Sequence, residues 1–408
     1  MSKRREVYLD NAATTPINKD VLGAMEPYLT VNYGNPGSLH RPGRVAREAV
    51  EKARTDISKV LNCKSEEIIF TSGGTESDNL AILGLARANR DKGKNIIVSN
   101  IEHKAVLDTC KKLEKEGFTI TYLKADKNGF ISVSDLKEKI KSDTILVSVM
   151  YANNEVGTIQ PIREIAKVIK KIRQARNFSP IRKTQDEKLE GFPIFHVDAC
   201  QAAPTLTLDI KKLGVDALTI SSSKIYGPKG IGCLYVNSGH KIEPIIFGGG
   251  QEKNLRSGTE NVASIVGFSK ALVLVQKNKL ADGVRLTKLR NYLYLNLKKE
   301  ISGVKINGSL KKRLPNNLNI SISDVEGETL VLLLDDLGIY CGTGSACSSL
   351  DLKPSYVLTN IGVPVELAHC SVRFTLGRQT TKSDIDYVIK SVIKMVNKVR
   401  SYSVIKHD

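Results

Sequence analysis

Along the first two thirds of the chain, short apolar runs alternate with longer segments in which apolar residues recur every three or four positions. The runs have the length of β-strands, and the spacing of the longer segments is typical of helices that bury one face. Strands are expected at 67–71, 95–99, 118–123, 144–150, 192–197, 216–220 and 232–236. Helices are expected at 18–31, 44–61, 78–88, 101–116, 133–140 and 162–175. Apolar strands that alternate with helices predict a mostly parallel sheet covered on both faces.

The strict alternation ends near residue 265. Helical patterns run from about 262 to 300, and shorter strand and helix patterns mix after them. The expected organisation is an N-terminal segment (1–17) that packs with the small domain, a large domain (18–265) and a smaller α+β domain (266–408). The polar stretch 173–191 interrupts the large domain and is expected to be an exposed insertion.

Polar residues gather where the apolar runs end. His103, Asn154, Asp198, Gln201 and Lys224 all fall just past expected strand ends. In an open parallel sheet, ligands bind in the crevice outside the carboxyl ends of the strands. This shared placement predicts one site at that edge of the sheet.

Lys224 lies between two apolar runs, and Gly227, Pro228 and Gly230 impose a tight loop after it. Burial would lower the pKa of the lysine and make its amine available as a nucleophile or Schiff-base former. A lysine whose stem is buried and whose ammonium reaches solvent is an equally good interpretation of these residues alone.

A glycine turn follows the strand expected at 67–71. The order strand, Gly73-Gly74, Thr75 and helix start is typical of an anion site, because free backbone amides and a hydroxyl face the same point. A simple helix cap is the alternative. No Gly-Lys-Ser/Thr follows, so the turn is not a Walker loop.

Two further candidates lie in the C-terminal part. Cys347 stands among small polar residues, which suits an accessible nucleophile, although a plain surface loop has the same composition. Arg373 interrupts an apolar strand and needs an anionic partner there. That partner is either a structural carboxylate or the carboxylate of a substrate.

Composition restricts the class of protein. No apolar run reaches the roughly 18 residues that suggest a membrane helix, and no signal peptide is apparent. The seven cysteines form no Cys-x-x-Cys pair, which argues against a disulfide framework or a structural zinc site and for a reducing, cytoplasmic environment. The net charge of +18 comes from lysines spread along the helices, so a solvated surface is favoured over a nucleic-acid site.

These motifs, in this order, resemble the NifS/IscS-type cysteine desulfurases of the class V aminotransferase family. The resemblance runs from residue 8 to about 385 and rests on 8–15, 71–77, 101–103, 152–162, 196–201, 221–230, 248–259 and 344–347. It implies the α/β fold of pyridoxal-phosphate (PLP) dependent transferases of fold type I. It also implies conversion of L-cysteine to L-alanine, with the sulfur left on Cys347 as a persulfide.

The resemblance implies roles for the residues at the expected site. Lys224 would hold PLP covalently and move the substrate Cα proton. His103 would stack on the ring and shuttle protons. Asp198 would pair with the pyridinium nitrogen, which keeps the ring an electron sink, and Gln201 would bind the ring hydroxyl oxygen.

Further implied roles concern the phosphate and the substrate. Phosphate contacts would come from Gly74, Thr75, Ser221 and Ser223, and from Thr259 across a dimer interface. Ser223 stands where the family usually has histidine. Substrate contacts would come from Arg373, Asn154 and Asn35. No resident metal is implied, although Cys347 could bind an iron–sulfur cluster transiently.

The implied partners are L-cysteine, a second copy of the chain and a sulfur-acceptor protein, either an iron–sulfur scaffold or a tRNA-thiolation protein. No membrane or direct nucleic-acid partner is expected. The spacing from Cys347 to 354–358 resembles the long-loop branch of the family, and the last residues lack the segment that some members use to dock a scaffold. The alternatives are a selenocysteine lyase, an aminotransferase, or a binding protein of this fold with weakened catalysis.

Overall fold

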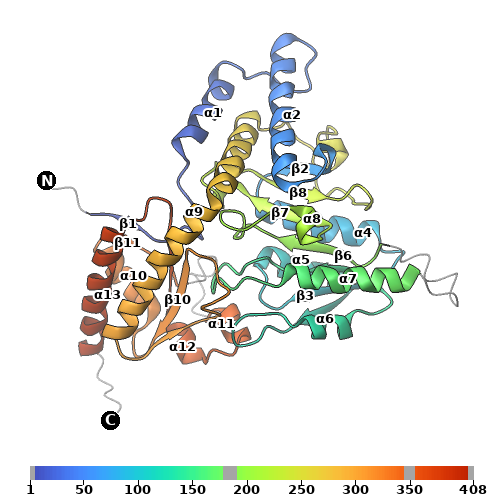
Figure 1. The fold of residues 1–408 in the computed structure, drawn as a ribbon. Coiled ribbons are helices and arrows are strands. Elements are labelled where there is room, and N and C mark those ends of the chain that lie inside the picture. Colours follow the sequence, from blue (N-terminus) through green and yellow to red (C-terminus); the bar gives the residue numbers. More distant parts are fainter. Residues whose placement is uncertain (1–4, 178–190, 344–353, 403–408) are drawn as a thin grey trace.

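The computed structural model describes residues 5–177, 191–343 and 354–402 (Figure 1). Its largest feature is a seven-stranded sheet in the order β2-β8-β7-β6-β5-β3-β4. These strands are β2 (Ile68–Thr71), β3 (Asn95–Ser99), β4 (Thr119–Leu123), β5 (Thr144–Ser148), β6 (Ile194–Asp198), β7 (Ala217–Ser221) and β8 (Gly232–Val236). β8 pairs antiparallel with both neighbours, and the remaining pairs are parallel. The predicted, mostly parallel sheet is confirmed.

Helices cover both faces of this sheet. In β2, Ile68 and Phe70 enter a core shared with α2 and α9, whereas Ile69 enters a second core shared with α4 and α5. Burial on both faces explains why the strands are continuous apolar runs in the sequence. The helices of this part are α1 (Lys19–Thr30), α2 (Arg41–Leu61), α3 (Gly74–Asn79), α4 (Leu85–Ala88), α5 (Lys104–Lys115), α6 (Val133–Lys139), α7 (Ile162–Asn177) and α8 (Ile210–Leu213).

A smaller assembly packs beside the large sheet (Figure 1). Its antiparallel sheet has the order β12-β10-β9, and β1 pairs in parallel with β11. These strands are β1 (Val7–Tyr8), β9 (Val304–Ile306), β10 (Asn317–Ile322), β11 (Ile339–Tyr340) and β12 (Ser371–Thr375). The accompanying helices are α10 (Gly327–Asp335), α11 (Tyr356–Asn360), α12 (Val365–His369) and α13 (Lys382–Tyr402). Val7 and Leu9 are buried in the core of this smaller assembly.

One long helix, α9 (Val262–Glu300), runs through both assemblies. Its buried residues as far as Val275 belong to the core of the large sheet, and those from Leu286 onward belong to the core of the small sheet. The change of core therefore falls inside a continuous helix. The division into domains at residue 265 stays a prediction.

Two local differences from the sequence expectation concern the ends of strands in the large sheet. The helical segment expected from 78 begins at Gly74, because Gly73 takes a φ of +149° that turns the chain directly into the helix, and a π-helical turn (Leu80–Gly84) continues it. Asp198 is the last residue of β6 rather than a residue beyond it. Within the described ranges, none of the helices combines the length and apolar character needed to span a bilayer.

Candidate active site

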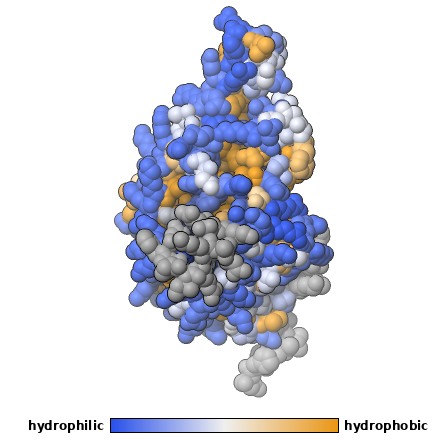
Figure 2. All heavy atoms as spheres, turned by 90° about the vertical axis from the view of Figure 1, so that its right-hand side faces the viewer, coloured by the Kyte–Doolittle hydropathy of each residue, from blue (hydrophilic) through white to orange (hydrophobic). Residues whose placement is uncertain are grey.

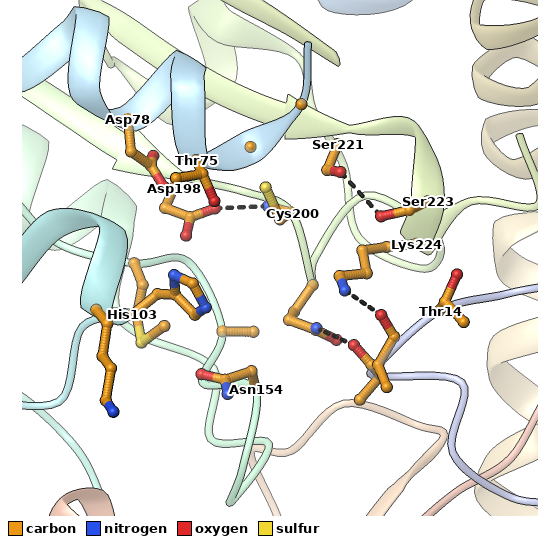
Figure 3. A pocket seen from close by; sticks show the side chains of 18 of the residues that line it. Thr14, Thr75, Asp78, His103, Asn154, Asp198, Cys200, Ser221, Ser223 and Lys224 are labelled. Carbon is orange, nitrogen blue, oxygen red and sulfur yellow. Dashed lines mark hydrogen bonds between the residues drawn. The ribbon is translucent and has the colours of Figure 1, made fainter. Parts of the chain in front are cut away.

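A cavity of about 500 Å³ opens at the carboxyl ends of β5, β6 and β7. Most of the residues predicted for the site line it: Gly74, Thr75, His103, Asn154, Asp198, Gln201, Ser221, Ser223, Lys224 and Arg373. Figure 3 shows several of them pointing toward a common space. Asn35 and Thr259 are exposed and do not line this cavity. Cys347 lies outside the described residues.

One end of the cavity is built for an anion. Gly74 begins the helical segment after β2, and a side chain there would collide with Cys200, whose Sγ would lie 2.8 Å from the added Cβ. The absence of a side chain leaves the backbone amides open. The Ser221 and Ser223 hydroxyls lie 3.1 Å apart on the facing wall, and the exposed Thr75 directly follows Gly74 in the turn. Hydroxyls and glycine amides together fit a phosphate group.

Lys224 ends a 3₁₀ turn, η4 (Ser222–Lys224), directly after β7. Its side chain is half-buried and points into the cavity, where Nζ donates a hydrogen bond to the carbonyl of Ala13 (Figure 3). The amide of Gln201 donates to the carbonyl of Ala12 at 2.9 Å. The N-terminal segment therefore closes one side of the cavity and holds two of its side chains. The lysine faces the cavity rather than bulk solvent.

Asp198 ends β6, and His103 follows β3, which lies on the other side of β5; both side chains point into the cavity (Figure 3). The Oδ1 atom of Asp198 accepts a hydrogen bond from the Cys200 amide at 2.9 Å, which fixes the carboxylate. His103 caps α5, because its Nδ1 accepts from the Ala105 amide at 3.1 Å. A neutral ring that accepts at Nδ1 carries its proton on Nε2. The cap thus sets both the ring orientation and the tautomer.

Arg373 lies in β12 with a side chain that is only 3% exposed. Its guanidinium donates to Asp10 Oδ1 at 2.8 Å and to the Asn154 carbonyl at 3.0 Å. The ion pair shows that a structural carboxylate is present. Because Arg373 also lines the cavity, a role toward a substrate carboxylate remains compatible with that pair.

Titratable groups that the sequence did not single out lie behind the cavity. Burial, with the charge of Asp198, raises the pKa of Asp78 well above its usual range, and burial raises the pKa of Glu102 to about 8. Burial lowers the pKa of His196 to about 4. Glu102 and His196 are therefore neutral near pH 7. One feature of the sequence could have pointed to these buried groups: an acidic residue, Asp78, stands at the start of an otherwise apolar helical pattern.

None of the six described cysteines has surroundings that favour the thiolate form. Each has a raised pKa, and burial is the largest cause at every position. Cys200 lines the cavity, but burial and the charge of Asp198 keep its thiol protonated. Nucleophilic attack requires a thiolate. Cys200 is therefore a wall residue rather than a nucleophile.

We expect the His103 ring to be neutral at pH 7 in the cofactor-free protein. Burial lowers its pKa below the ordinary 6.5 and outweighs the opposing charge of Asp198. Protonation thus needs a lower pH than an exposed histidine requires. An NMR titration of the ring, assigned by comparison with His103→Gln, should give a midpoint below 6.5. A midpoint above 6.5 would show that the nearby carboxylate, not burial, controls this ring.

The sequence matches the aminotransferase class-V family over residues 7–177 and 187–388. It is 49% identical to "Cysteine desulfurase IscS" of Dictyoglomus turgidum over 99% of this chain and 98% of that protein, and 47% identical to the protein of the same name from Methanosarcina thermophila over 98% and 95%. The chain belongs to the family of IscS-type cysteine desulfurases. The resemblance inferred from the motifs is confirmed.

Solved structures of the family agree with this assignment. A "NIFS-LIKE PROTEIN" superposes with a TM-score of 0.87 at 36% identity and covers 97% of this chain and 100% of its own. "SspA in complex with cysteine" gives 0.76 at 33% identity over 90% and 98%. The aminotransferase-like fold is thereby confirmed. Residues 178–186, within the expected insertion, lie outside the family match and outside the described residues.

Enzymes of this family depend on PLP, and the cavity fits that cofactor. The glycine turn and paired serines suit its phosphate, Asp198 suits a protonated ring nitrogen, and Lys224 suits its aldehyde. The orphaned Oδ1 of Asn154, buried without a partner among the described residues, is a polar atom that a bound group can satisfy.

Proposed function

We propose that this enzyme converts L-cysteine to L-alanine and retains the sulfur as a persulfide on Cys347. The observation that carries the proposal is the single cavity that brings Lys224, Asp198 and His103 together with a glycine-lined anion pocket. Sequence identities of 49% and 47% to two cysteine desulfurases, over nearly the whole chain, support the same reaction. A selenocysteine lyase, an aminotransferase and a non-catalytic binding protein are not favoured by these relatives.

Each side chain has a task that its surroundings support. Arg373 and Asn154 orient the substrate carboxylate, because they form one hydrogen-bonded unit on the cavity wall. Lys224 removes the Cα proton and returns it, since its amine points into the cavity. Neutral His103 delivers the proton on its Nε2 and recovers one there, because its Nδ1 accepts from the Ala105 amide. When bound, PLP supplies the electron sink for the pair that the departing proton leaves behind.

The sulfur transfer balances without an external oxidant. The Cys347 thiolate forms an S–S bond with the substrate sulfur while the Cβ–S bond of the substrate breaks. The electron pair of that bond stays on carbon, which takes up a proton to become the alanine methyl group. The products are alanine and a Cys347 persulfide.

We also propose that the active unit is a homodimer in which Thr259 contacts the phosphate of the second copy. Thr259 is exposed and absent from its own cavity, as that role requires. Large hydrophobic residues are exposed on α1, on the connection after it and beside the glycine loop: Leu22, Leu29, Val31, Tyr33, Leu39 and Phe247. Figure 2 shows one face on which hydrophobic residues gather in the upper half. Asn35 lies on the same connection, and its contact with substrate stays a prediction.

The proposed destination of the sulfur is an iron–sulfur scaffold protein in the cytoplasm. The support is the name shared by the curated relatives, which are IscS proteins. Delivery to tRNA thiolation is a second destination with the same persulfide chemistry, and it rests on the motif resemblance alone.

The test of the reaction type is product analysis. The PLP-loaded protein, given L-cysteine and a reductant but no 2-oxo acid, should form alanine and sulfide in equal amounts. An aminotransferase would need the 2-oxo acid and would release no sulfide in this way. Alanine formation that depends on an added 2-oxo acid would overturn the proposal.

A further inference from the structure

The loop between β8 and α9 contains a run of strained backbone. Glu252, Lys253 and Asn254 take φ values of 48°, 59° and 65°, and none of them is glycine. Such left-handed conformations are costly for residues with a side chain and persist only where the surroundings hold them. These three residues make up the short turn η5 (Glu252–Asn254). Something must fix this loop in place.

The Glu252 carboxylate supplies that restraint. Its side chain is 3% exposed. Arg54 donates to both carboxylate oxygens, from Nη2 to Oε1 at 2.7 Å and from Nη1 to Oε2 at 2.9 Å. The Phe70 amide donates to the same carboxylate at 2.9 Å, and Arg54 also donates to the Ile68 carbonyl at 2.8 Å. The guanidinium carbon lies 4.8 Å from the centre of the Phe70 ring. We call Glu252 and Arg54 the clamp.

The clamp acts on the strand that leads into the anion pocket. β2 is one of the two edge strands of the large sheet, and two residues after Phe70 the chain enters the glycine turn at Ser72. Beyond that turn, Arg256 of the same loop donates to Glu76 Oε1 at 2.9 Å. The other Glu76 oxygen accepts from the Ser72 amide at 2.8 Å. The loop therefore holds the glycine turn from both sides.

The loop is also closed on itself. The Gly258 amide donates to Gln251 Oε1 at 2.8 Å, so the clamp residue and Arg256 lie within one braced unit. Glu252 does not line the cavity, so it cannot touch a ligand there. Within its own subunit, Glu252 reaches the pocket through β2 and through Arg256.

We propose that Glu252 is a positioning residue for the phosphate-binding turn: with Arg54, it fixes the loop that brackets residues 72–75. The identity of the anion as the PLP phosphate rests on the function proposed above. Freed from the clamp, the turn amides lose their alignment toward the phosphate, while the ring-binding residues keep theirs. The expected consequence is a loss confined to the phosphate end of the cavity.

A competing explanation is that the clamp merely covers the edge of the sheet and adds stability. The chain contains a matched control for this. Asp216 is a partly buried carboxylate that also pairs with an arginine, Arg173, and accepts from a strand amide, that of Phe195 at 2.7 Å. It immediately precedes β7, at the end of the sheet opposite the cavity. Asp216→Asn should therefore show what loss of stability alone does.

The experiment compares Glu252→Gln with Asp216→Asn in the full-length protein. PLP and pyridoxal, which lacks the phosphate, are titrated by absorbance, and inorganic phosphate is titrated by isothermal titration calorimetry. Thermal unfolding and light scattering report stability and oligomeric state. Glu252→Gln should bind PLP and inorganic phosphate about tenfold more weakly, the scale expected when a residue that orients binding groups is changed. It should bind pyridoxal as tightly as the parent does. Asp216→Asn should lower stability while leaving all three affinities unchanged.

Equal weakening of PLP and pyridoxal, or unchanged phosphate binding, would overturn the proposal. If Glu252→Gln does not fold, Arg256→Gln tests the other arm of the loop, because Arg256 is only partly buried. It must show the same difference between PLP and pyridoxal, or the proposal fails. Phosphate binding is measured without turnover, so a protein that makes no alanine would contradict the proposed reaction and still decide the role of Glu252.

Discussion

Lys224→Ala should lower alanine formation from L-cysteine by about four orders of magnitude, because proton transfer by a positioned group contributes up to that factor. The substitution removes the amine that points into the cavity and donates to the Ala13 carbonyl. The variant should still bind PLP through the anion pocket. Treatment with borohydride should fix PLP to the parent chain and not to the variant, as mass spectrometry of the intact protein can show.

The control for this prediction is Lys279→Ala. Lys279 is a partly buried lysine that hydrogen-bonds Gln276 and lies outside the cavity. It should keep the activity and the borohydride labelling of the parent. Full activity in Lys224→Ala would mean that another base serves the reaction and that the central assignment of the site is wrong.

Asp198→Asn should reduce kcat by about a thousandfold, the scale on which removal of one preorganised electrostatic partner acts. The asparagine oxygen can still accept from the Cys200 amide, so the local geometry is kept while the negative charge is lost. The ring nitrogen of PLP then lacks the partner that keeps it protonated. Steady-state kinetics should show the loss mainly in kcat, and PLP titration should show that the cofactor still binds.

Asp209→Asn is the matched control for loss of an aspartate charge. Asp209 caps α8 and does not line the cavity. Its substitution should cost some stability and leave kcat within about twofold of the parent, as expected for a distant site. If Asp198→Asn had a kcat comparable to that of the parent, the negative charge of Asp198 would not be needed to keep the ring nitrogen of PLP protonated.

The residues at the strand ends could be predicted from the sequence because their placement follows from a general rule. His103, Asn154 and Lys224 each follow an apolar strand, and parallel strands bring their carboxyl ends to one edge. The side chains then meet without any knowledge of loop conformation. The glycine turn was likewise predictable, since its residues are local in sequence.

Contacts between distant segments could not be predicted in this way. The carbonyl of Ala13 meets Lys224 across 211 positions, and Arg54 meets Glu252 across 198. No periodicity or local motif encodes such pairings, because they depend on how complete layers pack. The same holds for the reversed direction of β8 and for the continuity of α9 through both cores.

The pKa shifts of the buried groups could not be predicted from the sequence, for a related reason. Glu102 lies in a polar tripeptide that looks solvated, yet it is fully buried, and burial raises its pKa to about 8. Desolvation is a property of the packed structure rather than of neighbouring residues. The sequence located the reacting groups and did not reveal the electrostatic environment behind them.

The most direct test of the central claim is anaerobic turnover of L-cysteine by the PLP-loaded protein beside Cys347→Ala, with alanine and sulfide counted in the presence of a reductant. We predict that the parent makes both products and that the variant binds PLP and cysteine but makes neither efficiently. If the parent makes no alanine, it is not a desulfurase. If the two proteins turn over equally, Cys347 is not the sulfur acceptor and the proposed reaction is wrong.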